Sequence, residues 1–323
     1  MKILSISELM ARQATVAFTI DQLLPHQGTL VLGGTPGIGK SWLLMRMALD
    51  VAAGQPWLGK FPVKQRTVLM VDEENARPLI RDRLGKLARG ARQHLKKLPL
   101  ILAIDQGVNF SRDSNVAELE KLVCKHDVGL VTIDSLVRVH DGDENSATEI
   151  ARMARGLRRI VRCGCSLAFT HHTRKPRGFG NDRANSLRGS SDIRAFVDTQ
   201  LTLSKTNGEL VVSHDKSRWC EAIHSFGVRI GNLANGRVEV FSPGGANLTL
   251  SNGTDRFILD VLKTGTVTRK DMLPQAAAAG IPTRSLDRRL KALTRSGIIE
   301  KLPRVNRETP YRLKKKPGNS PPP

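Results

Sequence analysis

A glycine-rich segment near the N-terminus has the spacing of a phosphate-binding loop. It follows the pattern G-x-x-x-x-G-K-S through Gly34, Thr35, Pro36, Gly37, Ile38, Gly39, Lys40 and Ser41. Glycines let successive backbone N–H groups turn towards phosphate oxygens, the lysine reaches the terminal phosphates, and the serine hydroxyl ligates Mg²⁺. An apolar run precedes the motif and a helical pattern follows it, so a helix N-terminus also faces the anion. We therefore predict a site for ATP and Mg²⁺ here, to which the adjacent Trp42 contributes.

Carboxylates follow two other apolar runs. Asp134 ends the run Leu130-Val131-Thr132-Ile133, where it could hold Mg²⁺ together with Ser41. Asp72-Glu73-Glu74 ends a second run and offers an acceptor that could orient or activate the attacking water. Because the carboxyl ends of parallel strands share one edge of a sheet, these groups are expected beside the phosphate loop. We predict Glu74 as the catalytic carboxylate, with Glu73 as the alternative.

Two further groups could sense or stabilise the terminal phosphate. His171-His172 ends a fifth apolar run, and no Cys, Asp or Glu stands at a spacing that would make the pair a metal site. One polar residue there, His171, is expected to report the state of the nucleotide. Lys216-Ser217-Arg218 follows a short strand-like run. It could reach the γ-phosphate held by a neighbouring subunit, as an arginine finger does, or be an ordinary basic loop.

The elements that must position these residues alternate between strand and helix. Apolar runs predict strands, and helical periodicity separates them, so we predict an α/β domain with a mostly parallel sheet covered on both faces. The predicted strands are residues 29–32, 67–71, 98–104, 129–133 and 166–170, and the predicted helices are 41–53, 77–89, 116–125 and 147–162. Beyond Ala195, turn residues separate short runs that predict hairpins extending the same sheet. These runs are 199–203, 209–213, 225–230 and 237–241.

The C-terminal part has the pattern of a separate small module. We predict an ATPase domain over 1–245, a linker over 246–253, the module over 254–313 and a disordered basic, proline-rich tail over 314–323. Within the module, helices 255–263, 270–279 and 283–295 and strands 298–302 and 310–313 resemble a winged helix-turn-helix. Leu286, Leu290 and Leu293 share one face of the last helix and are expected in the module's core.

Basic residues dominate both the module and the whole chain. From Thr254 onward there are sixteen Lys and Arg against six Asp and Glu, a net charge of +10. The predicted duplex contacts of the last helix are Arg284, Arg288, Arg289 and Arg295. The formal charge of the chain is +21 and its pI is about 10.5. That excess favours a polyanionic partner, nucleic acid before an acidic membrane surface.

The cysteine content also indicates the cellular compartment. The four cysteines, Cys124, Cys163, Cys165 and Cys220, form no C-x-x-C pair, which favours a reducing cytosol over a disulfide framework or a zinc ribbon. No signal peptide and no membrane-spanning run is expected. We therefore expect a cytoplasmic location.

Taken in order, the motifs resemble a known family. The phosphate loop, Glu74, Ile133-Asp134, Thr170-His171-His172 and Arg188-Gly189-Ser190-Ser191 are similar to the RecA-type ATPases of the RepA-like AAA group. The resemblance extends over about residues 18–240. It implies that Glu74 is catalytic, that His171 senses phosphate and that Lys216 and Arg218 form a finger. Arg194 lies near a second position where the family places its finger arginine and competes with Arg218.

The resemblance also implies partners. Members form rings, in this case a predicted homo-hexamer, and act on DNA as helicases. The segment 173–191 resembles a DNA-binding loop that lines the pore, with Arg174, Lys175, Arg177 and Arg183 as predicted contacts to single-stranded DNA. The implied activity is that of an ATP-driven helicase or translocase in plasmid, phage or mobile-element replication. An ATP-switched DNA-binding regulator or loader and a KaiC-like signalling ATPase remain the alternatives.

Overall fold

The computed structural model divides the chain into two compact units, Met1–Gly245 and Ala246–Pro323. Each unit is considered by itself. The residues that the structure describes are 5–10, 16–143, 146–173, 191–206, 208–233, 236–242, 253–263, 265–279, 281–295, 299–303 and 308–313.

A nine-stranded sheet forms the centre of the first unit, with strand order β11-β10-β9-β8-β3-β7-β6-β4-β5. Strands β3 to β8 pair in parallel, whereas β8, β9, β10 and β11 form successive antiparallel pairs. The strands are β3 (Thr29–Gly34), β4 (Thr67–Asp72), β5 (Leu100–Ile104), β6 (Val128–Asp134), β7 (Ser166–His172), β8 (Thr199–Thr206), β9 (Glu209–Ser217), β10 (Phe226–Leu233) and β11 (Arg237–Phe241). The mostly parallel sheet predicted from the sequence is confirmed, and the late hairpins extend it as expected.

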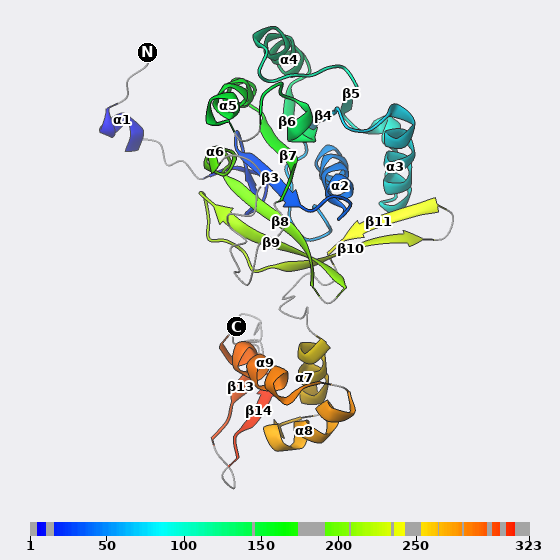
Figure 1. The fold of residues 1–323 in the computed structure, drawn as a ribbon, viewed down its shortest axis with the longest axis vertical. Helices are drawn as coiled ribbons and strands as arrows, with labels where there is room; N and C mark the ends of the chain where they lie inside the picture. Colours follow the sequence, from blue (N-terminus) through cyan, green and yellow to red (C-terminus); the bar gives the residue numbers. More distant parts are fainter. Residues whose placement is uncertain are drawn as a thin grey trace, which may run out of the picture. The chain divides into compact units, whose positions relative to one another are not determined.

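Helices cover both faces of this sheet (Figure 1). One layer contains α2 (Lys40–Ala53) and α3 (Arg77–Gly90), and the other contains α4 (Asp113–Lys125), α5 (Ala147–Arg162) and α6 (Ser191–Phe196). Every residue of β3 and β6 is buried, because both faces of these central strands are covered. Their continuous apolar runs are the sequence signature of that position.

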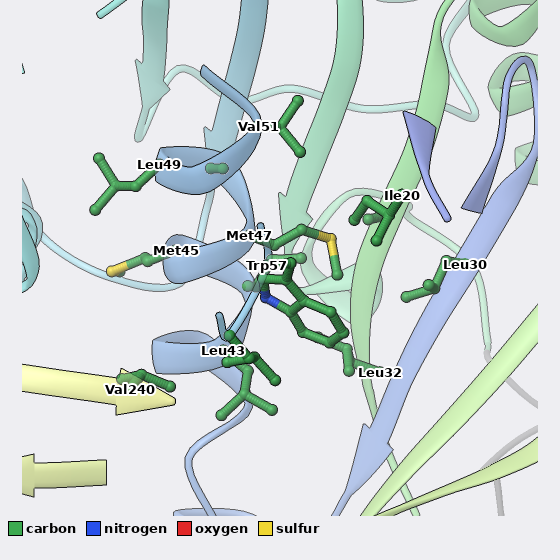
Figure 2. Close-up of a cluster of buried hydrophobic side chains, with 14 of the residues drawn as sticks. Ile20, Leu30, Leu32, Leu43, Met45, Met47, Leu49, Val51, Trp57 and Val240 are labelled. Atoms are coloured by element: carbon green, nitrogen blue, oxygen red, sulfur yellow. The ribbon is translucent and has the colours of Figure 1, made fainter. Parts of the chain in front are cut away.

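A cluster around Trp57 fills the space between α2 and β3 (Figure 2). The indole lies among Leu32 of β3 and Leu43 and Met47 of α2, and all four side chains are fully buried. Burial of one such side chain contributes roughly 1.5–3 kcal/mol. This packing fixes α2, and with it the phosphate loop at its N-terminus, against the strand that leads into the loop.

Several short elements lack a sequence signal or differ from the predicted bounds. The structure adds α1 (Ile6–Met10), β1 (Phe18–Ile20), β2 (Leu24–Pro25), α6 and two 3₁₀ turns, Leu95–Lys97 and Leu136–Arg138. Strand β9 continues to Ser217, so Lys216 and Ser217 belong to the strand and do not follow it. Strand β5 begins at Leu100 because the 3₁₀ turn ends at Lys97 and Leu98 caps it.

The described residues of the second unit form three helices and a three-stranded sheet of order β12-β14-β13. These elements are α7 (Gly253–Lys263), β12 (Val267–Thr268), α8 (Arg269–Ala278), α9 (Thr283–Arg295), β13 (Ile299–Lys301) and β14 (Pro310–Leu313). Leu286, Leu290 and Leu293 are buried in its core, as expected. Thr268 and Asp271 form a capping box at the start of α8. The predicted linker residues 246–252 and the tail 314–323 lie outside the described residues.

Within the part of the chain that the structure describes, no helix has the length and apolar character needed to cross a bilayer.

Candidate functional site

The phosphate loop connects β3 to α2 and contains two glycines in the left-handed region. Gly37 has φ +71° and Gly39 has φ +110°, conformations that a side chain would strain. The Lys40 ammonium is buried and donates to the carbonyls of Gly34 (2.9 Å) and Thr35 (3.0 Å). Burial lowers the pKa of Lys40, and the charges of Asp134 and Glu74 oppose that shift. The lysine is therefore held inside the loop with two carboxylates in electrostatic range.

Asp134 lies at the end of β6, in register with Asp72 of β4. Thr170 Oγ1 donates to Asp134 Oδ1 at 2.5 Å, and Asp134 Oδ2 is buried and accepts no hydrogen bond from the described residues. Burial raises the pKa of Asp134, while the Thr170 hydroxyl that donates to it and the nearby Ser41 hydroxyl lower that pKa. Among the described residues, no group of three or more His, Cys, Asp or Glu side chains could hold a metal ion.

This donor set fits a Mg²⁺ ion that is held mainly by phosphates and water. Mg²⁺ in such sites takes only one or two protein oxygens. The Ser41 hydroxyl and the orphaned Asp134 carboxylate oxygen supply that number, and a buried acceptor without a donor is costly unless a cation or water satisfies it.

The three carboxylates after β4 have different surroundings. Asp72 is buried and accepts from the backbone N–H groups of Glu74 (3.1 Å) and Asn75 (2.8 Å), which fixes the turn. Burial raises the pKa of Asp72 to about 6, and these backbone hydrogen bonds oppose the shift.

Glu73 and Glu74 point to different neighbours. The Glu73 carboxylate accepts three backbone N–H groups, from Gln106, Gly107 and Val108, each at 3.1 Å. Glu74 is exposed, and its charge acts on both Lys40 and Asp134. Glu73 therefore anchors the loop after β5, and Glu74 is the carboxylate whose charge acts on the phosphate-loop lysine.

The two histidines at the end of β7 lie on opposite faces of the sheet. In the parallel register His171 pairs with Gly33 and His172 with Gly34, and alternate residues of a strand face opposite sides. His171 is buried, whereas the half-buried His172 places Nδ1 3.5 Å from Lys40 Nζ. Sequence reasoning named His171, and the side chain beside the phosphate-loop lysine is His172. The register between β3 and β7 determines which of the two adjacent histidines lies beside the lysine, and a single sequence does not reveal that register.

The candidate finger residues contact α6 of their own subunit. Lys216 Nζ donates to the carbonyls of Arg194 (2.5 Å) and Val197 (2.6 Å). Arg218 donates to the Ala195 carbonyl and lies 3.5 Å from the Asp198 carboxylate. Burial first, and then the charge of Arg218, lowers the pKa of Lys216 to about 8. Both cations thus bind the C-terminal end of the helix that carries Arg194, the competing candidate.

One contact near the site was missed by sequence reasoning. The Arg83 guanidinium lies 5.5 Å from the centre of the Trp42 ring and 3.5 Å from Asn75 Oδ1. Trp42 directly follows Ser41, and Asn75 binds the Asp72 carboxylate through its side-chain amide. Arg83 thereby joins the phosphate-loop helix to the turn that presents Glu74. The available sequence signal for this contact was the position of Arg83, two helical turns into α3, the helix that follows the segment bearing Glu74.

The predicted DNA contacts divide between described and undescribed residues. Arg174, Lys175, Arg177 and Arg183 lie outside the described residues. On α9, Arg284 and Arg288 are exposed and Arg289 is half-buried, while the side chain of Arg295 is not described. The exposed pair lies one turn apart, on the face away from the buried leucines.

Comparison with known proteins identifies the family. A family model described as an AAA domain (AAA_25) matches residues 1–178, more than half of the chain. The search of curated proteins found no match. The matched residues include the phosphate loop, the turn bearing Glu74, Asp134 and both histidines. The chain therefore belongs to this AAA-domain family of P-loop ATPases.

Proposed function

We propose that the protein is an ATP-hydrolysing, DNA-binding ATPase that assembles into a ring and acts as a helicase or translocase on DNA. One observation carries the proposal. Lys40, Ser41, Asp134 and Glu74, which are spread over almost a hundred residues of sequence, gather at one edge of the parallel sheet. That is the edge at which ligands bind in open α/β folds.

In the proposed reaction each of these residues has a separate task. The loop backbone and Lys40 bind the β- and γ-phosphates, and Ser41 and Asp134 hold Mg²⁺, which when bound neutralises charge on the transferred phosphoryl group. Glu74 accepts a proton from the attacking water or orients it. His172, which lies beside Lys40, and its neighbour His171 are the candidates for sensing the γ-phosphate. The 3.5 Å contact with Lys40 supports His172.

The proposed ring supplies the remaining catalytic charge. Arg218, with Lys216, would reach the γ-phosphate of the adjacent subunit, and Arg194 is the alternative. The partial exposure of Arg218, directly after β9, supports this role. A homo-hexamer remains the proposed assembly.

Contact with DNA is assigned to two regions. The segment 173–191 is proposed to line the pore and to bind single-stranded DNA through Arg174, Lys175, Arg177 and Arg183. The C-terminal unit is proposed to be a winged helix that binds duplex DNA through α9. Its three helices, its three-stranded sheet and the exposed Arg284 and Arg288 support that proposal.

The experiment that tests the hydrolytic site is the variant Lys40→Ala, with Lys64→Ala as the matched control. Lys64 is exposed and lies outside the site. Lys40→Ala should abolish ATP hydrolysis while leaving folding and DNA binding intact, and Lys64→Ala should hydrolyse ATP at the wild-type rate. Undiminished hydrolysis by Lys40→Ala would refute the site.

A second candidate function is an ATP-switched DNA-binding regulator or loader. The separate, strongly basic C-terminal unit favours it, because such a unit could direct the protein to a specific duplex without unwinding. Unwinding of a forked duplex with ATP, and hydrolysis stimulated by single-stranded DNA, would support the helicase. Hydrolysis stimulated only by one duplex sequence, without unwinding, would support the regulator.

A further inference from the structure

The outer face of α5 carries a row of arginines that the proposed site does not use. Arg152, Arg155, Arg158, Arg159 and Arg162 form this α5 arginine stripe. At 100° per residue, all five side chains leave the helix within an arc of about 120°. The other exposed positions of the helix, Ala147, Thr148 and Ala151, carry no charge.

The inner face of the same helix fixes the direction of the stripe. Ile150, Met153, Leu157 and Ile160 are buried against the sheet. Gly156 allows close contact, since a Cβ there would lie 2.1 Å from the Phe110 carbonyl oxygen. In Figure 1, α5 lies beside α4 and α6 in one helical layer. The arginines therefore project from a rigid support and face away from the sheet.

Neighbouring groups neutralise only part of the stripe. Arg159 binds Glu120 (2.5 Å) and Asp113 (3.0 Å) of α4, and Arg158 lies 5.5 Å from the Phe196 ring centre. Arg152, Arg155 and Arg162 are exposed and form no ion pair with any described residue. At 1.5 Å per residue they extend along about 15 Å of the helix. That length corresponds to about four phosphates of one nucleic-acid strand.

We propose that the α5 arginine stripe binds the phosphodiester backbone of DNA, as a third contact in addition to the segment 173–191 and the C-terminal unit. The guanidinium fork matches phosphate oxygens in a bidentate way, which suits arginine at every position of the row. DNA is favoured as the partner because the stripe is uniformly cationic and a phosphodiester backbone is uniformly anionic. The inference extends the proposed DNA binding and does not depend on ATP hydrolysis.

The test compares two triple variants of the full chain that lose equal charge. The stripe variant is Arg152→Gln/Arg155→Gln/Arg162→Gln. The matched control is Arg92→Gln/Lys96→Gln/Lys97→Gln, which removes three exposed cations ahead of β5. Fluorescence anisotropy with a single-stranded oligonucleotide and with a duplex of the same sequence gives the affinity at 50–200 mM salt. Sedimentation follows the assembly state, and circular dichroism checks folding.

Three lost phosphate contacts should reduce the slope of log K against log salt by about 2.7 for duplex or 2.1 for a single strand. Over that salt range the wild-type affinity should thus fall about 40-fold more than that of the stripe variant for duplex, or about 20-fold more for a single strand. The substrate whose slope falls by the amount expected for it is the form bound. The control should keep the wild-type slope. If the stripe variant fails to fold, Arg152→Lys/Arg155→Lys/Arg162→Lys should preserve the slope but weaken binding.

An unchanged slope in the stripe variant would refute the stripe and leave the proposed function intact. A changed assembly state with an unchanged slope would show that the stripe contacts a second copy, which also overturns the proposal. Wild-type protein that binds neither oligonucleotide at 50 mM salt would refute the proposed DNA-binding function itself, and the stripe with it.

Discussion

Substitution of Glu73 and of Glu74 should separate stability from catalysis. Glu73 accepts three backbone N–H groups of the loop after β5, each at 3.1 Å. A hydrogen bond to a charged group contributes about 1.5–3 kcal/mol when isolated, but these groups are partly exposed and water can replace the acceptor. We therefore expect Glu73→Ala to lower the free energy of unfolding by about 2 kcal/mol in total. For a unit of 245 residues this corresponds to a decrease in Tm of about 4–8 °C.

Glu74→Gln should give the opposite result. Glu74 is exposed, so its substitution should change the free energy of unfolding by less than about 0.5 kcal/mol. Loss of the carboxylate whose charge acts on Lys40 and Asp134 should lower kcat about 10²- to 10⁴-fold. Thermal unfolding and steady-state phosphate release measure the two effects on each variant. If Glu73→Gln abolishes hydrolysis while Glu74→Gln does not, the two roles are reversed. An unchanged Tm for Glu73→Ala would refute the anchoring role.

Three further expectations follow from particular contacts. Gly156→Ala should destabilise the fold by about 1–3 kcal/mol in denaturant unfolding, because its Cβ would lie 2.1 Å from a backbone oxygen. In the matched variant Gly85→Ala, the Cβ meets only the flexible Arg89 side chain at 3.3 Å, so this variant should stabilise the fold by about 0.5–1 kcal/mol. Burial raises the pKa of Asp50 to about 6 in the folded protein from 3.8, so the folded state binds more protons between these values. The stability of the wild type should therefore fall with rising pH across that window by up to about 3 kcal/mol relative to Asp50→Asn, and parallel stability curves would contradict this. Asp134→Asn should raise the Mg²⁺ concentration needed for half-maximal hydrolysis, whereas an unchanged Mg²⁺ requirement would exclude Asp134 as a ligand.

The parts of the fold that the sequence could predict are those fixed by local pattern. Each central strand is a continuous apolar run, and the phosphate loop is defined by consecutive residues, so both were identified from the chain alone. The placement of His172 depends on the register between β3 and β7, which are separated by more than a hundred residues. The anchoring by Glu73 joins residues 33 to 35 positions apart. Neither relationship produces a periodicity, so only the assembled sheet reveals them.

Hydrogen bonding within the subunit distinguishes the two cations proposed to reach a neighbouring site. Lys216 is half-buried in β9, and its ammonium satisfies two carbonyls at the end of α6. Removing it would take one donor from each of these acceptors, at a cost of about 1–3 kcal/mol each where they are shielded from water. Arg218 lies beyond the strand, where its hydrogen bond to the Ala195 carbonyl is exposed to water. Its ion pair with Asp198 is partly exposed, an interaction that contributes about 0–1 kcal/mol. The smaller cost of release favours Arg218 as the cation that leaves to contact a neighbour's phosphate. Lys216 would keep its hydrogen bonds and hold the end of α6 in place while Arg218 moves.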